Sequence, residues 1–290
     1  MRFKAHESFS IRKGWLYKGL KNIAEQPDLF SNKSINPTDV LGIGTNMVRS
    51  LRYWLQVTGL TKETNAGGRH QEFTELARII WEYDKYMEEI GTLWLLHYKL
   101  STQQEEATAW YYLFNEFSLL EFNKEDFVDM VYLYAKINGT EVAESSLDGD
   151  FNCLLKTYIS KENTDMDPEN NIECPLCDLN LIDVSDKEKK TYRKVSPKKG
   201  TIHPLIIFSV IVDNAKSSEI KISSILNDKN NVGRVFNLDI ITLMESLYEL
   251  QKLGYIKINR TAGLDVININ KNMTFEQAAE EYYINLDQQS

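Results

Sequence analysis

Three side chains near the beginning of the sequence have the chemical types needed to cleave a phosphodiester. His6 and Glu7 are adjacent, and Arg12 follows in the same short segment. A histidine or a carboxylate can act as a general base or bind a divalent metal, and an arginine can stabilise the charge that develops in the transition state. Proximity in the sequence does not establish proximity in space, so this catalytic hypothesis stands beside a structural role for the same residues.

The cysteines give a weaker indication of a metal. Cys174 and Cys177 form one CxxC pair, whereas a structural zinc site needs four ligands, usually from two such pairs. Cys153, His70 or His203 would have to complete the set at irregular spacing. The sequence therefore favours ordinary cysteines over zinc. A cleavage centre would use Mg²⁺ or Mn²⁺, bound by ligands that the sequence does not identify.

One expected helix carries a face rich in hydrogen-bond donors. Residues 45–57 have the periodicity of an amphipathic helix, with Val48, Leu51 and Trp54 on the inward stripe. The outward side has no carboxylate, and its side chains can donate to a phosphate or a base edge: Asn46, Arg49, Arg52, Tyr53 and Gln56. Arginine suits guanine and asparagine suits adenine. The alternative is an ordinary helix with a basic solvent face.

The residues that precede this helix extend the nucleic-acid hypothesis. Arg12, Lys13 and Lys18 lie on the segment before it, where they would meet backbone phosphates. Gly44 directly precedes the helix, and a helix N-terminus is a favourable place for a phosphate. A brief helix before the turn at Gly42 completes a helix-turn-helix near residues 36–58. The first part of the chain therefore favours DNA or RNA binding.

The elements that must position these residues are mostly helical in the first half of the chain. Apolar periodicity and capping residues predict these helices: 15–25, 45–57, two helices within 73–98 broken near Gly91, 108–120 and 124–137. The last 90 residues differ, because helices expected over 204–213, 220–227 and 238–253 precede a β-hairpin over 255–269. That order is typical of a winged helix.

Carboxylates on the third of these C-terminal helices argue against DNA reading by this part of the chain. Asp239, Glu245 and Glu249 would face phosphates, which repel them. The sequence therefore favours protein contacts or dimerisation for this module, and a homodimer remains open. The expected organisation is a helical domain over 1–184, a basic linker over 185–200 and a winged-helix-like domain over 201–290. The fold class is mainly α with small β-hairpin wings, that is, α+β.

Composition and charge place limits on the function. The chain of 290 residues is 42% hydrophobic and 26% charged, as expected for a globular protein of more than one domain. It has three cysteines, no apolar run long enough to span a membrane and no signal-peptide pattern, which predicts a cytoplasmic protein. The formal net charge is −9, but basic side chains predominate in residues 1–60 and 185–200. A polyanion responds to such local patches more than to the total charge.

Several blocks of the sequence resemble a bacterial family with a domain of unknown function, encoded in Ssp-type DNA phosphorothioation defence operons. The resemblance extends over nearly the whole chain, and its blocks keep their order: 6–9, 12–16, 41–48, 52–55, 91–98, 108–112 with 114–115, 175–176 with 181–182, and 261–264. Members of this family accompany a cysteine desulfurase, an ATPase and a reductase-like sulfur-transfer enzyme. Together these proteins replace a non-bridging oxygen of the DNA backbone with sulfur, in defence against phage.

The resemblance implies a DNA-binding component of such a system. The best-known member of the family is described as a DNA-nicking component, so the resemblance leaves open whether this chain nicks DNA to permit sulfur insertion. No recognised nuclease motif is present in the sequence. Two alternatives stand beside nicking: a non-catalytic DNA-binding adaptor that recruits the sulfur-transfer proteins, and a winged-helix transcription regulator.

Overall fold

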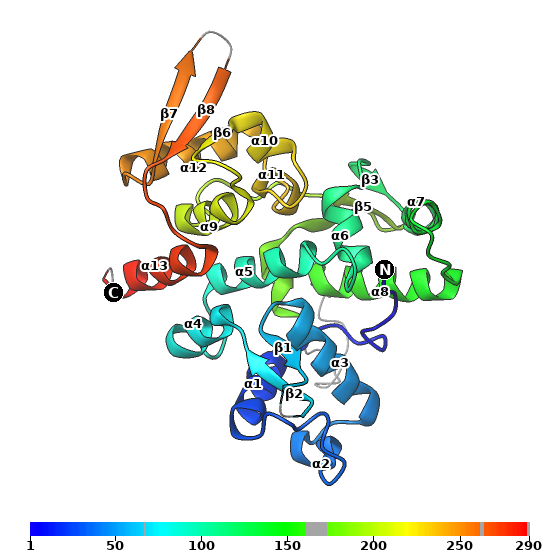
Figure 1. The fold of residues 1–290 in the computed structure, drawn as a ribbon. Helices are drawn as coiled ribbons and strands as arrows, with labels where there is room; N and C mark the ends of the chain where they lie inside the picture. The colour runs from blue at the N-terminus through cyan, green and yellow to red at the C-terminus, as the bar shows by residue number, and fades with distance from the viewer. Residues whose placement is uncertain (67, 161–172, 262–263, 289–290) are drawn as a thin grey trace. The chain divides into compact units, whose positions relative to one another are not determined.

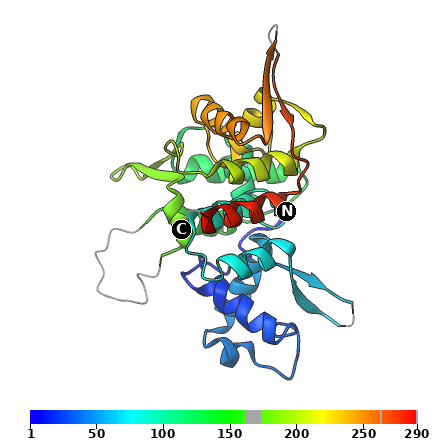
Figure 2. The same cartoon turned by 90° about the vertical axis from the view of Figure 1, so that its left-hand side faces the viewer.

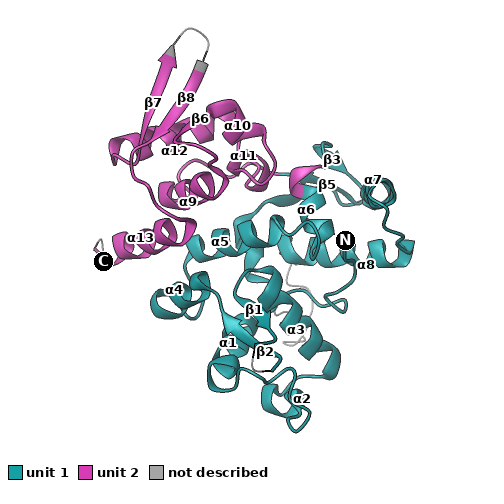
Figure 3. Cartoon of the chain, in the orientation of Figure 1, with its two compact units in different colours: residues 1–113, 117–194 teal, residues 114–116, 195–290 magenta. Residues whose placement is uncertain are grey.

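Helices and short antiparallel sheets make up the regular structure, and this confirms the expected α+β class. The computed structural model describes residues 1–66, 68–160, 173–261 and 264–288 (Figure 1). The chain divides into two compact units (Figure 3). Unit 1 comprises Met1–Leu113 and Phe117–Lys194, and unit 2 comprises Phe114–Glu116 and Val195–Ser290.

Unit 1 contains most of the helices. In chain order they are α1 (Trp15–Glu25), α2 (Pro37–Leu41), α3 (Thr45–Val57), α4 (Glu75–Tyr83), α5 (Ile90–Ser101), α6 (Thr108–Asn115, which ends in unit 2), α7 (Lys124–Ile137), α8 (Glu144–Tyr158) and the short 3₁₀ helix η1 (Pro175–Leu179). Local caps fix several starts: the Asn36 side chain accepts from the Thr38 amide at α2, and Asn123 and Asp126 form a capping box at α7.

Two small sheets complete unit 1. Strands β1 (Thr61–Thr64) and β2 (His70–Phe73) form an antiparallel hairpin between α3 and α4. Strands β3 (Glu121–Phe122), β4 (Ile182–Asp186) and β5 (Thr191–Lys194) form the second sheet, in the order β3-β5-β4. Both views show the β1–β2 hairpin beside α1, α3 and α4 (Figures 1 and 2).

The core of unit 1 is unusually aromatic. Trp54, Trp94, Trp110 and Phe127 are each at most 1% exposed. Helix α5 is buried on nearly every side, with Lys99 as its exception among the residues that follow Ile90. Helix α1 packs closely on α3, which places α3 firmly against the rest of the unit and leaves its other side for the features described below.

Unit 2 follows a different order. Its elements are α9 (Pro204–Asn214), β6 (Glu219–Lys221), α10 (Ile222–Asn227), α11 (Val232–Val235), α12 (Ile240–Lys252), β7 (Ile256–Thr261), β8 (Leu264–Ile269) and α13 (Phe275–Asp287). The sheet has the order β6-β8-β7 and is antiparallel. The buried helix α9 packs against α12 and α13, and the β7–β8 hairpin extends away from the helices of this unit in both views (Figures 1 and 2).

Several expected boundaries are corrected by the structure. The break expected near Gly91 lies a few residues earlier, between α4 and α5, and Gly91 is the buried second residue of α5. In this break the Asp84 carboxylate accepts from the backbone amides of Glu88 and Glu89 and so ends one helix and begins the next. The helix expected over 108–120 ends at Asn115. The hairpin β1–β2 and the helix α8 were not expected.

The basic segment 185–200 is also different from the expected linker. Its first part contains the end of β4 and all of β5, which pair with each other in unit 1. Arg193 on β5 forms an ion pair with Asp183 on β4, at 2.7 Å. Part of the charged segment 185–200 thus forms a strand and not a linker. Charged side chains suit a surface strand, because its alternate residues face water. The division between the two units falls between Lys194 and Val195.

Candidate nucleic-acid interface

A pocket of about 590 Å³ in unit 1 gathers cationic side chains from three parts of the chain. The cations that line it are Arg2 from the N-terminal segment, Arg49 and Arg52 from α3, and Lys62 and Arg69 from the β1–β2 hairpin. Glu7, Glu63 and Glu106 also line it. We call this the arginine pocket. Its surplus of positive charge contrasts with the net charge of −9 of the whole chain.

Helix α3 supplies one wall of the arginine pocket. Its inward stripe is buried as expected, with Leu51, Trp54 and Leu55 at 0% exposure. This fixes the helix rotation and leaves Arg49 with 65% of its side chain exposed. Arg52 is partly covered, with 26% of its side chain exposed.

Tyr53 does not lie on the exposed face that the helical periodicity predicted. The residue is only 4% exposed, and burial raises its pKa well above the ordinary value. The guanidinium carbon of Arg2 lies 5.8 Å from the centre of its ring. Tyr53 thus forms part of the floor of the pocket, because the N-terminal segment covers the side of α3 that the sequence left open.

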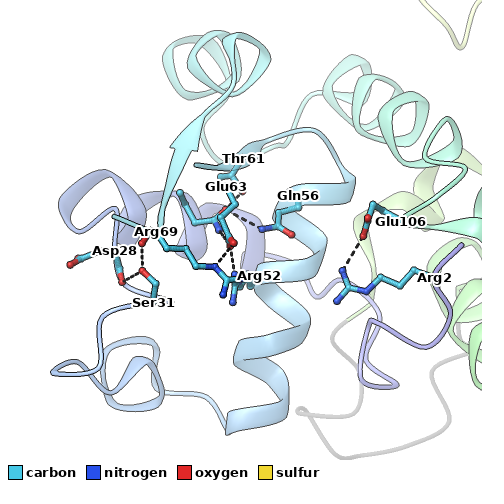
Figure 4. Close-up of polar contacts among 10 residues, drawn as sticks. Arg2, Asp28, Ser31, Arg52, Gln56, Thr61, Glu63, Arg69 and Glu106 are labelled. Atoms are coloured by element: carbon cyan, nitrogen blue, oxygen red, sulfur yellow. Dashed lines mark hydrogen bonds and ion pairs between the residues drawn. The ribbon is translucent and has the colours of Figure 1, made fainter. Parts of the chain in front are cut away.

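The β1–β2 hairpin supplies the opposite wall, where one carboxylate receives three donors. Glu63 on β1 accepts hydrogen bonds from Arg52 and Arg69 (Figure 4) and from the Gln71 amide, at 2.9 Å. Partial burial raises the pKa of Glu63, but the hydrogen bonds from the two arginines outweigh it, so the net pKa lies below the ordinary value. Glu63 therefore stays ionised at neutral pH.

The remaining cations of the arginine pocket also have carboxylate partners. Arg2 donates to Glu106 at 3.0 Å (Figure 4), and Arg49 lies 3.9 Å from Glu7. Lys62 lies 3.5 Å from Glu72. These pairs are largely exposed to solvent, and exposed pairs contribute only about 0–1 kcal/mol each. A polyanion could therefore replace these carboxylates at little cost.

The three residues of the catalytic hypothesis are not brought together. His6 is fully buried, with Nε2 2.7 Å from Asp150 Oδ1 and Nδ1 accepting from the Ser8 amide at 3.0 Å. Glu7 lines the arginine pocket, whereas Arg12 lines a second pocket of about 720 Å³. His6 lines neither pocket. The geometry thus gives His6 a structural role.

The other expected DNA contacts are spread over the surface of unit 1. Arg12 lies over the rings of Phe9 and Trp15, at 5.9 and 5.3 Å, and Lys13 lines the same second pocket. The Lys18 ammonium donates to the Leu41 carbonyl at 3.2 Å and so ties α1 to the end of α2. Gly44 and Asn46 are exposed at the start of α3. Only Arg49, Arg52, Tyr53 and Gln56 of the expected set line the arginine pocket.

Sequence reasoning missed the part of the site that comes from the hairpin and the N-terminus. Arg2, Lys62, Glu63 and Arg69 were not singled out. The available signal was a polar, β-branched run over 61–64, two glycines, and a second short run over 70–73, a pattern typical of a hairpin. The hairpin was hard to predict because both strands carry charged side chains, and neither has the apolar alternation of a half-buried sheet.

The metal hypothesis finds little support in the donor groups of the described residues. Within residues 1–66, 68–160, 173–261 and 264–288 there is no group of three or more His, Cys, Asp or Glu side chains placed to hold a metal ion. Glu63, the most enclosed carboxylate of the arginine pocket, already faces two guanidinium groups. These residues do not fit a divalent-cation site, so no chemical step is assigned to a metal.

The CxxC pair has the environment of buried structural thiols. Burial, followed by the charge of a neighbouring cysteine, raises the pKa of Cys174 well above the ordinary value. Burial and the carboxylates of Glu173 and Asp178 raise the pKa of Cys177 to about 12. Nucleophilic chemistry needs the thiolate. Neither thiol is poised to form it.

Comparison with known proteins identifies the family. Residues 3–283 match the family described as Protein of unknown function (DUF4007), and the chain therefore belongs to it. This confirms the resemblance to a domain-of-unknown-function family that the sequence blocks indicated. No curated protein matches the sequence.

Two solved structures share the fold. A magnesium ion-bound crystal structure of SspB superposes with a TM-score of 0.82 at 22% sequence identity, and covers 99% of this chain and 95% of that chain. A second SspB crystal structure gives a TM-score of 0.81 at 23% identity, and covers 99% of this chain and 87% of that chain. Among the residues that the structure describes, none of the helices has the length and apolar character needed to cross a membrane.

Proposed function

We propose that this protein is the DNA-binding component of a DNA phosphorothioation system that defends bacteria against phage. We propose further that the arginine pocket is the surface that contacts DNA. One observation carries the proposal: four arginines and a lysine from three separate segments converge on one pocket of an otherwise acidic chain. The likeness of its fold to SspB and the resemblance of its sequence blocks to a family of phosphorothioation operons support the same assignment.

The chemistry of the pocket suits the DNA backbone better than base edges. Guanidinium groups bind phosphate oxygens in a planar, bidentate manner. Each phosphate that is neutralised releases condensed counterions, and this release supplies much of the affinity. The acidic remainder of the chain would repel DNA, so electrostatics would also orient the protein with its arginine pocket towards the duplex.

Unit 2 has features that favour protein contacts within the same system. Its order of elements, with α12 followed by the β7–β8 hairpin and β6 paired to β8, supports a winged-helix-like organisation. The outer side of α12 exposes Ile240, Ile241 and Tyr248. Apolar side chains that are exposed together mark interaction surfaces. We propose that this face contacts the sulfur-transfer proteins of the operon: the cysteine desulfurase, the ATPase and the reductase-like enzyme.

The experiment that tests DNA binding changes two charges on α3. The double variant Arg49→Glu and Arg52→Glu should weaken binding to a fluorescein-labelled duplex by about tenfold or more and lower the slope of log K against log salt by about two, because each lost phosphate contact removes roughly one unit. A matched control with the same charge change, Arg78→Glu and Lys85→Glu, alters exposed side chains that do not line the pocket. Equal losses in both variants would contradict the proposed surface.

A supercoiled-plasmid assay separates binding from cleavage. With and without Mg²⁺ or Mn²⁺, a protein that only binds DNA retards the plasmid and leaves it supercoiled. Metal-dependent conversion to open circles would instead establish a nicking enzyme. Because His6 is buried, loss of nicking in His6→Ala would need a folding control before it located a catalytic residue. Binding restricted to one operator sequence, typically about a thousandfold or more over random DNA, would favour a transcription regulator.

A further inference from the structure

The carboxylate of Glu63 occupies a place that is built for an anion. Its two oxygens together accept from two guanidinium groups and one carboxamide, those of Arg52, Arg69 and Gln71 (Figure 4 shows the two arginines). The donors come from α3 and from β2 or the turn before it, so separate segments converge on one point. We call the place where these donors meet the Glu63 seat.

Gln71 is a buried donor of the Glu63 seat, and other side chains hold it in place. This side chain is only 3% exposed, so its amide cannot turn to water for partners. The Thr61 hydroxyl donates to Gln71 Oε1 at 2.9 Å, and the Gln56 amide lies 3.4 Å from the same oxygen. With its oxygen held by these donors, the Gln71 NH₂ group points at Glu63 Oε2, 2.9 Å away. A buried donor is thus aimed into the seat and requires an acceptor there.

The Glu63 seat is open to the arginine pocket. The Glu63 side chain is 22% exposed, and those of Arg52 and Arg69 are 26% and 58% exposed. All three line the arginine pocket, so an anion in the pocket has access to the guanidinium groups of Arg52 and Arg69. A phosphate presents the same array of acceptors to guanidinium and amide donors as a carboxylate does, with one oxygen more.

We propose that the Glu63 seat is a phosphate-binding site, that Glu63 occupies it in the free protein, and that a phosphate of the DNA backbone replaces the Glu63 carboxylate on binding. This inference rests on the proposed DNA binding and names the group that is recognised. Glu63 then acts as a built-in competitor. It satisfies Arg52, Arg69 and Gln71 while DNA is absent, and it excludes free phosphate, which lacks the neighbouring contacts that a duplex makes with Arg2, Arg49 and Lys62.

The test removes the charge of the competitor and keeps its shape. Glu63→Gln should bind a fluorescein-labelled duplex about tenfold more tightly than the wild type, since one charge-assisted contact no longer has to be broken. It should also acquire binding of inorganic phosphate, read as phosphate-dependent thermal stabilisation that the wild type lacks. The matched control is Glu75→Gln, an exposed carboxylate in the first turn of α4 that does not line the pocket. It should change duplex affinity by less than about twofold, as expected of a single screened surface charge.

A second pair of variants shows that the gain arises in the seat. Adding Arg69→Gln to Glu63→Gln should abolish both the tighter duplex binding and the phosphate binding. Glu63→Asp, whose shorter side chain cannot span both arginines, should give a smaller gain of the same sign and decides the matter if Glu63→Gln fails to fold. The proposal is overturned if folded Glu63→Gln binds the duplex no better than Glu75→Gln.

The outcomes distinguish this inference from the proposed function. If the wild type binds DNA and the Arg49→Glu, Arg52→Glu variant does not, while Glu63→Gln changes nothing, then DNA binding stands and the exchange at the seat is wrong. If no variant binds the duplex but Glu63→Gln binds inorganic phosphate, the seat is an anion site and the proposed DNA binding is wrong.

Discussion

The imidazole of His6 is fixed in one protonation pattern by its two neighbours. A backbone amide can only donate, so the contact from Ser8 makes Nδ1 an acceptor. Nε2 then carries the proton, which it donates to Asp150 Oδ1 at 2.7 Å. The same carboxylate oxygen accepts from the Lys4 amide at 2.9 Å. His6 and Asp150 therefore tie the N-terminal segment, which contributes Arg2 and Glu7 to the arginine pocket, to helix α8.

Removal of His6 should destabilise the protein because the buried carboxylate of Asp150 loses its hydrogen bond from the imidazole and keeps the one from the Lys4 amide. We expect His6→Ala to lower the free energy of unfolding by roughly 1.5–3 kcal/mol, the range for losing a buried hydrogen bond to a charged group. Urea unfolding followed by circular dichroism measures this. His70→Ala is the control, since the His70 side chain is 27% exposed. If His6→Ala unfolded at the same urea concentration as the wild type, the structural role would be refuted and the catalytic hypothesis would again be open.

The three cysteines should behave as unreactive thiols in the folded protein. Burial is the main cause that raises the pKa of Cys153, Cys174 and Cys177. In the unfolded chain these thiols ionise near the ordinary value of 9.0, whereas the folded pKa of Cys177 is about 12. The unfolded state therefore loses protons first as pH rises, and stability falls between these two values.

This pH dependence is measurable. Urea midpoints should be constant from about pH 7 to 8 and decline above about pH 9. Reaction with a thiol reagent at pH 8 should be negligible in the native state and should report all three cysteines after denaturation. Fast labelling of the native protein would show that at least one thiol is accessible and ionised, contrary to this account.

At the scale of elements, Gly233 in α11 has no room for a side chain. A Cβ at this position would lie 2.0 Å from the backbone oxygen of Leu226, so the backbone itself would have to move. We expect Gly233→Ala to destabilise unit 2 by about 3 kcal/mol, the upper range for overpacking. Gly149 provides the control, because it lies within α8 and a Cβ there meets nothing closer than 3.6 Å.

Gly149→Ala should therefore leave stability unchanged or raise it by up to about 1 kcal/mol, the helix propensity difference. Both variants are compared by thermal unfolding with probes in each unit. If Gly233→Ala were tolerated as well as Gly149→Ala, the packing of α11 against α10 would differ from that described.

Elements whose signals are local were predictable from the sequence. The bounds expected for α1, α3 and α7 are confirmed, because apolar periodicity and nearby caps determine them within a few residues. The start expected for the third C-terminal helix, at residue 238, is wrong: Asp239 caps α12, which begins at Ile240. The bounds of other helices depend on tertiary contacts, which a local pattern does not reveal. Helix α5 is buried almost all round and so has no amphipathic period, and its start depends on Asp84 rather than on a glycine.

Only the part of the candidate site that lies on α3 could be predicted, because its signal is local. Arg49, Arg52 and Gln56 follow from the periodicity of one helix. Their partners Glu63 and Arg69 lie on a hairpin whose position depends on packing between segments, and the spacing of residues cannot give it. Tyr53 was misplaced because a helix has more than one covered side once the N-terminal segment packs on it.

At the scale of the whole molecule, the distribution of charge matters more than its sum. The chain has a net charge of −9, yet the arginine pocket has more cations than carboxylates. The side chains of Arg2, Arg49, Lys62 and Arg69 are between 53% and 65% exposed, so a duplex can reach all four. Screening confines their attraction to about a Debye length, roughly 10 Å at 0.1 M salt, and also weakens repulsion from the acidic remainder.

Binding to DNA should therefore be steeply dependent on salt despite the acidic composition. Four to five phosphate contacts correspond to a slope of about −4 in log K against log salt, so affinity should fall on the order of a hundredfold between about 50 and 200 mM salt. Fluorescence anisotropy with one duplex over this range measures the slope, and two unrelated duplex sequences should give the same slope, because backbone phosphates carry no sequence information. A slope near zero would mean that the arginine pocket does not meet the DNA backbone. In that case the carboxylates that pair with these cations would be structural partners rather than groups that DNA displaces.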